Sequence, residues 1–156
     1  MKTLSEPRVL AGGEFLPRVL DVSRQAATAT GASYQTLYTL SIPANTLGTG
    51  RMIRAMFDLR QTTGTGGTTI RLTYGATAVV TQSLARAGNR HLIVKLWGDN
   101  ATNAQRGSIS DTTAAGYSVG TATEDSTGAL NFVLSMDLTT DTDVYTLDNA
   151  TVEVLE

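Results

Sequence analysis

The chain has no cysteine, one histidine and one tryptophan among its 156 residues. The missing cysteines exclude disulfide bonds, thiolate-bound zinc and thiol chemistry. The net charge is −2 at pH 7, so the chain lacks the basic surplus that bulk binding to nucleic acid or to an anionic membrane requires. No apolar run is long enough to predict a bilayer span or a secretory signal. We therefore expect no cofactor, no nucleic acid and no membrane among its partners.

Helical periodicity is also missing, and short alternating runs take its place. In residues 130–138 every even-numbered residue is large and apolar, as a half-buried strand requires. Further runs of this kind lie at residues 53–59, 70–74, 76–84, 91–97, 107–110, 117–121 and 150–155. About eight to ten short strands at such spacing predict an all-β domain, built as a sandwich, a jelly roll or a barrel.

Residues 34–60 contain two alternating runs joined by a turn at residues 43–46, and we interpret them as a hairpin. The second run points Arg54, Asp58 and Arg60 away from the core, which makes them candidate interface residues. The first run places five residues on its core-facing side, namely Tyr34, Thr36, Tyr38, Leu40 and Ile42.

The sequence Pro-Arg-Val-Leu occurs twice near the N-terminus, at residues 7–10 and 17–20. We predict that residues 1–24 form an extended arm and that residues 25–156 form a single antiparallel β-sandwich. The arm would dock on a neighbouring subunit by adding strands to a sheet edge. The alternative is that the second copy is simply the first strand of the sandwich. The candidate interface residues in the arm are Arg8, Val9, Leu10, Arg18, Val19 and Leu20.

One motif resembles a catalytic signature but lacks the parts that the chemistry needs. Residues 116–120 match the G-x-S-x-G nucleophile elbow, which requires a strand-to-helix turn and a histidine base later in the chain. The single histidine, His91, comes earlier, and no helical pattern follows Gly120. We therefore expect a glycine-flanked strand around Ser118, a solvated histidine at a strand edge, and no catalytic residue.

Acidic residues gather at residues 124–125 and 141–143. The second group is similar to a calcium-binding loop, but the turn glycine and closing glutamate of an EF-hand are missing. We expect a solvated loop without a metal; a calcium site assembled from non-consecutive loops is the alternative. Residues 64–67 lack the lysine of a phosphate-binding loop, and we interpret them as a hairpin loop.

Two segments carry a resemblance: residues 37–48, which read Leu-Tyr followed by Ile-Pro-Ala-Asn and Leu-Gly, and residues 71–75. Over about half of the chain, residues 36–110, the sequence resembles small jelly-roll structural proteins of tailed bacteriophages, of the head-decoration (cement) or fibre-head type. The resemblance implies a jelly roll, a homotrimer, and a virion protein assembled in the host cytoplasm. Its partner would be the major capsid protein or another virion protein, and no catalytic residue is carried over.

We therefore predict a bacteriophage virion structural protein, in the first place a capsid decoration protein that binds and stabilises the head shell as a trimer. The alternative is the receptor-binding head of a tail fibre or spike, which would bind a host glycan or protein through loops such as residues 61–67 or 99–106. A carbohydrate-active enzyme is the third class. It is disfavoured because no catalytic constellation is recognisable and Trp97 is the only tryptophan for stacking on sugars.

Overall fold

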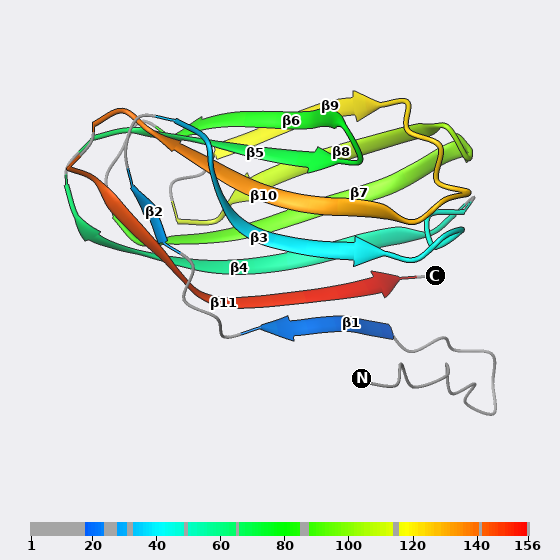
Figure 1. Ribbon diagram of the computed structural model, residues 1–156, viewed down its shortest axis with the longest axis horizontal. Helices are drawn as coiled ribbons and strands as arrows, with labels where there is room; N and C mark the ends of the chain where they lie inside the picture. The colour runs from blue at the N-terminus through cyan, green and yellow to red at the C-terminus, as the bar shows by residue number, and fades with distance from the viewer. Residues whose placement is uncertain are drawn as a thin grey trace.

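The computed structural model shows two antiparallel β-sheets packed face to face (Figure 1). It describes residues 18–23, 28–30, 33–48, 50–64, 66–84, 88–113, 116–140 and 142–155. These ranges contain eleven strands and no helix, so the predicted all-β sandwich is confirmed. Accordingly, no helix that could cross a membrane occurs in the described part of the chain.

The last two strands of the chain lie inside the two sheets and not at their edges. The larger sheet has the order β1 (Arg18–Ser23), β11 (Val144–Leu155), β4 (Met52–Thr63), β7 (Arg90–Ala101), β8 (Ala104–Asp111) and β9 (Gly116–Ala122), with β2 (Thr28–Thr30) also paired to β11. The smaller sheet has the order β3 (Gln35–Ile42), β10 (Leu130–Leu138), β5 (Thr68–Tyr74) and β6 (Thr77–Leu84). Such pairing of distant strands is typical of Greek-key and jelly-roll sandwiches.

The core lies between the sheets and consists of the residues that the alternation placed inside. Ile53, Ala55 and Phe57 of β4 are fully buried, as are Phe132 and Leu134 of β10. The ring of Phe57 stacks on that of Phe132 with the centroids 6.5 Å apart, which joins the two sheets at the centre. Each strand thus buries one apolar side, and this burial is the main favourable contribution to folding.

The hairpin predicted for residues 34–60 is wrong, because β3 and β4 belong to opposite sheets. Their apolar sides meet across the core: the rings of Tyr38 and Phe57 make an edge-to-face contact with centroids 5.2 Å apart. The connecting residues 43–51 are enough to cross the roughly 10 Å between stacked sheets. Residues 64–67 also connect the two sheets, so they are not a hairpin loop either.

Strand β3 departs from the predicted alternation at Leu37. The register pairs Tyr38 with Leu134 and Thr36 with Ser135, which leaves Leu37 without a residue opposite it. This β-bulge turns Leu37 into the core and Thr36 out to solvent, whereas simple alternation had placed Thr36 inside. Beyond the bulge, the side chains from Tyr38 to Ile42 alternate between core and solvent as predicted.

The edge strands β6 and β9 approach each other closely, and glycines allow this. A side-chain carbon on Gly120 would lie 1.8 Å from the carbonyl oxygen of Val79. One on Gly116 would lie 2.1 Å from the side-chain nitrogen of Gln82. The G-x-S-x-G pattern therefore marks a close contact between two sheet edges, and Ser118 lies within a strand, as predicted.

At the opposite edge, β1 is tied to the smaller sheet by a hydrogen bond. The Tyr38 hydroxyl donates to Oδ2 of Asp21 at 2.7 Å. Burial, and then the Asp21 carboxylate, raise the pKa of Tyr38 far above its ordinary value, so the hydroxyl remains a donor at any physiological pH. Both edges of the sandwich are thus closed by specific contacts between the sheets.

Strand β1 corrects the predicted boundary between arm and sandwich. Arg18, Val19 and Leu20, assigned to the arm, lie in β1 and pair with β11. Leu20 packs against the core, whereas Val19 is half exposed. The sandwich therefore begins no later than Arg18, because β1 pairs with β11 from this residue onward and its Leu20 packs against the core. The first copy of the repeat, with Arg8, Val9 and Leu10, lies outside the described residues.

We expect Leu134→Asp to prevent folding, because a carboxylate in the fully buried centre of β10 costs more than about 4 kcal/mol. Val133→Asp is the matched control, because this side chain lies on the outward side of the same strand. Its free energy of unfolding should stay within about 1 kcal/mol of the parent's. Circular dichroism and urea titration measure both. Normal melting of Leu134→Asp would show that this side of β10 is not core.

We expect Gly120→Ala to lower the free energy of unfolding by about 1–3 kcal/mol, since its new methyl group must displace the backbone of β6. Gly128→Ala serves as the control, because nothing lies within 4 Å of a carbon added there. Thermal denaturation compares the two variants. Equal melting temperatures would contradict a close contact between β6 and β9.

Candidate binding face

The outward sides of the two sheets differ in chemistry. The smaller sheet turns hydroxyl and amide groups to solvent, as expected for an antiparallel sheet with one wet face. The exceptions at its central positions are Val133 and the charged Arg71 and Asp137. The cross-strand registers place the following polar residues on this outward side: Thr36, Thr39, Ser41, Thr69, Thr73, Thr81, Ser83 and Asn131.

The larger sheet carries apolar side chains on its outward side as well as on its core side, interspersed there with charged residues such as Arg54, Asp58 and Lys95. We call this outward side the apolar face and define it by nine residues that the registers place there: Val19, Val22, Met52, Met56, Ile93, Trp97, Tyr117, Val119 and Leu155. The most exposed are Val19, Val22, Tyr117 and Val119, at 51–66% of their surface. These four are the exposed large apolar side chains among the described residues, and all belong to this one face.

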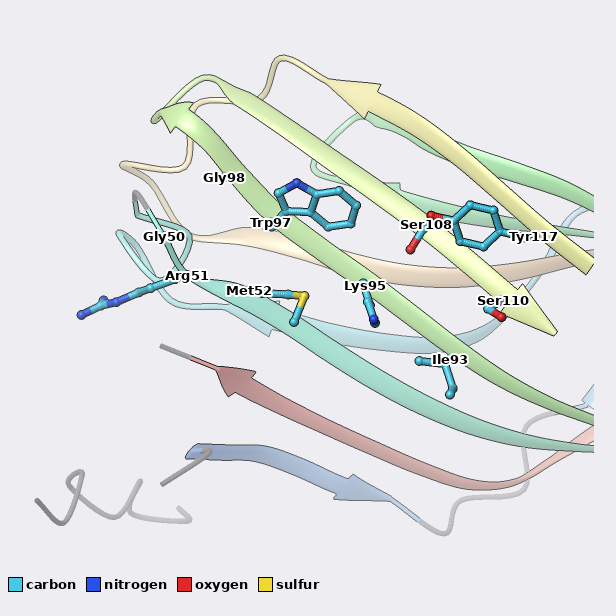
Figure 2. A pocket seen from close by; sticks show the side chains of 10 residues that line it. All are labelled: Gly50, Arg51, Met52, Ile93, Lys95, Trp97, Gly98, Ser108, Ser110 and Tyr117. Atoms are coloured by element: carbon cyan, nitrogen blue, oxygen red, sulfur yellow. The ribbon is translucent and has the colours of Figure 1, made fainter. Parts of the chain in front are cut away.

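A pocket of about 570 Å³ lies at the β9 side of the apolar face. Figure 2 shows Trp97 of β7 and Tyr117 of β9 on either side of Ser108 of β8, with Lys95 also on β7 and Met52 on the adjacent β4. Its lining contains two aromatic rings, two cations and two hydroxyls, and neither a carboxylate nor a histidine. The lining residues are Gly50, Arg51, Met52, Ile93, Lys95, Trp97, Gly98, Ser108, Ser110 and Tyr117.

The strands place these side chains by simple alternation. In β7, Leu92, Val94 and Leu96 are fully buried in the core, so Lys95 and Trp97 must point outward. The registers continue these positions across the sheet into β8 and β9. The pocket therefore rests on four adjacent strands of the sheet, β4, β7, β8 and β9, together with the short turn before β4.

Glycines shape the end of the pocket next to β4. Gly50 has a φ of +83°, a conformation that favours glycine. A side-chain carbon on Gly98 would lie 3.0 Å from the carbonyl oxygen of Gly48, so the turn passes directly against β7. The backbone N–H of Arg51 donates to the carbonyl of Gly48 at 3.2 Å, which closes the turn. From this end, the Arg51 side chain extends away from the other lining residues (Figure 2).

Lys95 is the unpaired cation of the pocket. It lies directly across from Arg54, and like charges at such a pair are unfavourable. Arg54 is neutralised by Glu153, whose carboxylate lies 2.5 Å away. In the part of the chain that the structure describes, no carboxylate pairs with Lys95, and its side chain is exposed.

The three charges predicted to meet a neighbour lie on the outward side of β4, as expected, but each has a partner within the chain. Arg54 pairs with Glu153, Asp58 with His91 at 2.6 Å, and Arg60 with Asp148 at 2.9 Å. Hydrogen bonding to Arg60 lowers the pKa of Asp148 below its ordinary value. These pairs fix neighbouring strands to one another. Their role as an interface stays a prediction.

His91 and Ser118 do not come together as the nucleophile elbow would require. His91 is the second residue of β7, and its Nδ1 contacts Asp58 of β4, while Ser118 lies in β9 on the far side of β8. The prediction of an edge histidine is wrong, because β7 lies between β4 and β8 inside the sheet. The side chain of His91 is nevertheless partly exposed. The preceding residue, Arg90, is buried and pairs with Asp111 at 3.1 Å, which the sequence did not suggest.

The acidic residues have structural partners. Glu124 accepts a hydrogen bond from the backbone of Ala76 at 3.1 Å and so holds the turn between β5 and β6. Burial, together with Glu124, raises the pKa of Tyr74 to about 12. Asp143 is fully buried, so the prediction of a solvated loop is wrong at this residue; Asp141 lies outside the described residues. The described residues contain no group of three or more side chains that could hold a metal ion.

The loops predicted to bind a receptor have other contacts. Residues 64 and 66 lie against Asp143, where a carbon added to Gly64 would collide with its carboxylate. In the second loop, Arg106 pairs with Asp99 at 2.8 Å. Sequence reasoning missed the pocket, although one signal existed. Residues 92–97 are apolar at both odd and even positions apart from Lys95, which indicates a strand that is apolar on both sides.

Comparison with known proteins gives structural likeness at low identity. No family model and no curated protein matches the chain. The CBM2 module of the evolved Dit of Lactobacillus casei BL23 phage J-1 is similar over 96% of this chain and 79% of its own, at 13% identity and a TM-score of 0.42. Lotus tetragonolobus seed lectin is similar over 96% and 90%, at 7% identity and a TM-score of 0.46. Basic winged bean lectin is similar over 86% of this chain and 92% of its own, at 9% identity and a TM-score of 0.40. At these values the likeness assigns no family and transfers no ligand.

Proposed function

We propose that this chain is a bacteriophage virion protein that works as a non-catalytic binding module and that it attaches to its target through the apolar face. The receptor-binding head of a tail fibre or spike is the role that the pocket on this face fits best. The virion setting is supported by the resemblance of residues 36–110 to phage structural proteins. The binding surface is supported by the structure's own chemistry.

One observation carries the proposal: all exposed large apolar side chains of the described residues lie on the outward side of one sheet, two on each of its edge strands β1 and β9. Exposed large apolar side chains that are confined to one face of a protein often mark a contact surface. The composition of the face also fits an interface, since aromatic residues, Met and Arg are enriched where proteins bind partners. The polar outward side of the smaller sheet provides the contrast within the same molecule.

The pocket favours binding over catalysis. Its lining has no carboxylate and no histidine, the side chains most often used as general acids and bases. Asp58 and Glu153, on the same side of the sheet, are already paired with His91 and Arg54. A recessed site with two aromatic rings and few polar groups is the usual form of a small-ligand site.

Capsid decoration by a homotrimer is the second candidate, and β1 is the observation that favours it. Val19 and Val22 are exposed at the edge of the apolar face, on the strand that contains most of the second Pro-Arg-Val-Leu copy. A partner that covers these valines would contact the preceding segment as well. In this role the face and residues 1–17 would together bind the head shell or a neighbouring subunit.

We expect the double variant Val22→Glu, Val119→Glu to lose attachment to host cells or phage particles by at least about tenfold, since both carboxylates would have to be buried in the contact. The matched control is Thr73→Glu, Thr81→Glu on the polar side of the smaller sheet, which should attach normally. Co-sedimentation of purified protein with cells or particles measures both. Normal attachment of the first variant would place the binding surface elsewhere.

We expect removal of residues 1–17 to leave a folded sandwich, because β1 is retained, and to abolish binding to undecorated capsids if the decoration role holds. Val9 and Leu10 could contribute roughly 3–6 kcal/mol gross on burial. Co-sedimentation reads the binding, and light scattering reads whether the intact 16.5 kDa chain forms a trimer. Full capsid occupancy by the truncated protein, or a stable monomer at micromolar concentration, would contradict this role.

A further inference from the structure

We infer that the pocket between Trp97 and Tyr117 binds a saccharide that carries a negatively charged group. The inference rests on the proposed function, because the pocket is part of the apolar face, and it adds the chemical class of the ligand. Three features of the lining carry it: the spacing of the aromatic rings, the hydroxyl groups between them and the unbalanced positive charge.

The aromatic rings are placed for an extended ligand. Trp97 and Tyr117 lie two strands apart across the sheet and four positions apart along it, since Ile93 is in register with Ser110 and Ser110 with Tyr117. Ordinary strand spacing then puts their backbones about 16 Å apart. Rings with an apolar body and a polar tip suit ligands that are partly apolar and partly hydrated. The apolar C–H faces of sugar rings meet this requirement, and the separation matches a short oligosaccharide.

Hydroxyl groups lie between the two rings. Ser108 is on the outward side of β8 but is only 3% exposed, so it forms the floor of the pocket. Ser110, the next outward residue of β8, adds a second hydroxyl. A hydroxyl both donates and accepts hydrogen bonds, which is what the hydroxyl groups of a sugar need from a binding site.

The charge of the lining selects the class of saccharide. Lys95 is an exposed cation of the lining, and no carboxylate lines the pocket. Lys95 faces Arg54 across the strands although this costs stability, and Glu153 neutralises Arg54 alone. A negatively charged group that neutralises Lys95 must therefore come from outside the described residues. An anion next to Lys95 would remove the repulsion and gain a charge-assisted hydrogen bond.

The test is calorimetric titration of the full chain with three probes: sialyllactose, an oligogalacturonate, and neutral lactose as the reference. We expect at least one acidic probe to bind at least about tenfold more tightly than lactose, with an advantage that shrinks as salt rises. A sulfated oligosaccharide in a further arm separates carboxylate from sulfate recognition. Equal affinity for all probes, or no binding at millimolar concentration, would overturn the inference.

Variants assign the binding to this pocket. Lys95→Gln should remove the preference for acidic probes, and Trp97→Ala should weaken acidic and neutral probes alike. Arg60→Gln removes one positive charge at the other end of β4 and should change nothing. Tyr34→Ala, directly before β3 of the other sheet, is the control for losing a ring. Near-ultraviolet circular dichroism checks the folding of each variant. An acidic preference that survives in folded Lys95→Gln would place the site elsewhere.

The outcome also separates this inference from the proposed function. If the valine-to-glutamate variant loses attachment but no acidic saccharide binds, the apolar face contacts a protein and only the inference fails. If acidic saccharides bind and lose affinity in Lys95→Gln while attachment survives the valine changes, the pocket is a saccharide site and the wider face is not the attachment surface.

Discussion

The contact between β6 and β9 is the constraint on which the shape of the sandwich depends. Backbone meets backbone at Gly120 and Val79, so the edges of the two sheets are joined without a side chain between them. Strand β9 is consequently small on its core side, with Gly116, Ser118 and Gly120. Its bulk is on the outward side, as Tyr117 and Val119. The residues that close the sandwich and the residues that project from the apolar face therefore alternate along one short strand.

The same contact explains why an enzyme-like motif can arise without the chemistry. A serine between two glycines at alternate positions satisfies the G-x-S-x-G pattern whenever a strand must pass close to another backbone. The structural requirement is that the side of β9 facing β6 carries no large side chain. Ser118 is the small residue between the two glycines on that side. The motif is informative only when a turn and a helix follow it, and here β9 continues as a strand to Ala122.

Alternation predicted which side of each strand is apolar, and it did so well for β4, β5 and β10. It could not predict which sheet a strand joins, because the core sides of β3 and β4 look the same whether the strands are paired or face each other. The bulge at Leu37 was also hidden, since a single extra residue changes the side without changing the composition. Buried Arg90 and Asp143 depend on partners distant in sequence, which local patterns do not contain.

The candidate site was even less visible in the sequence. Each lining residue is unremarkable alone, and the pocket exists only because β7, β8 and β9 place Trp97, Ser108 and Tyr117 on one side of the sheet. The charges that were visible, on β4, are the ones that pair within the chain. Lys95 is notable because no described carboxylate pairs with it, and this can be recognised only once its neighbours in the structure are known.

The interior positions of β10 and β11 have a consequence for how the chain acquires its structure during synthesis. These strands occupy residues 130–155, yet each separates strands made much earlier: β3 from β5, and β1 from β4. A nascent chain that ends before them has two unfilled slots lined with unpaired backbone groups and cannot complete either sheet. Folding must therefore wait for release of this segment from the ribosome, and until then the open slots are available to any extended peptide nearby. A late, nearly all-or-none folding step with slow non-local pairing follows from this topology.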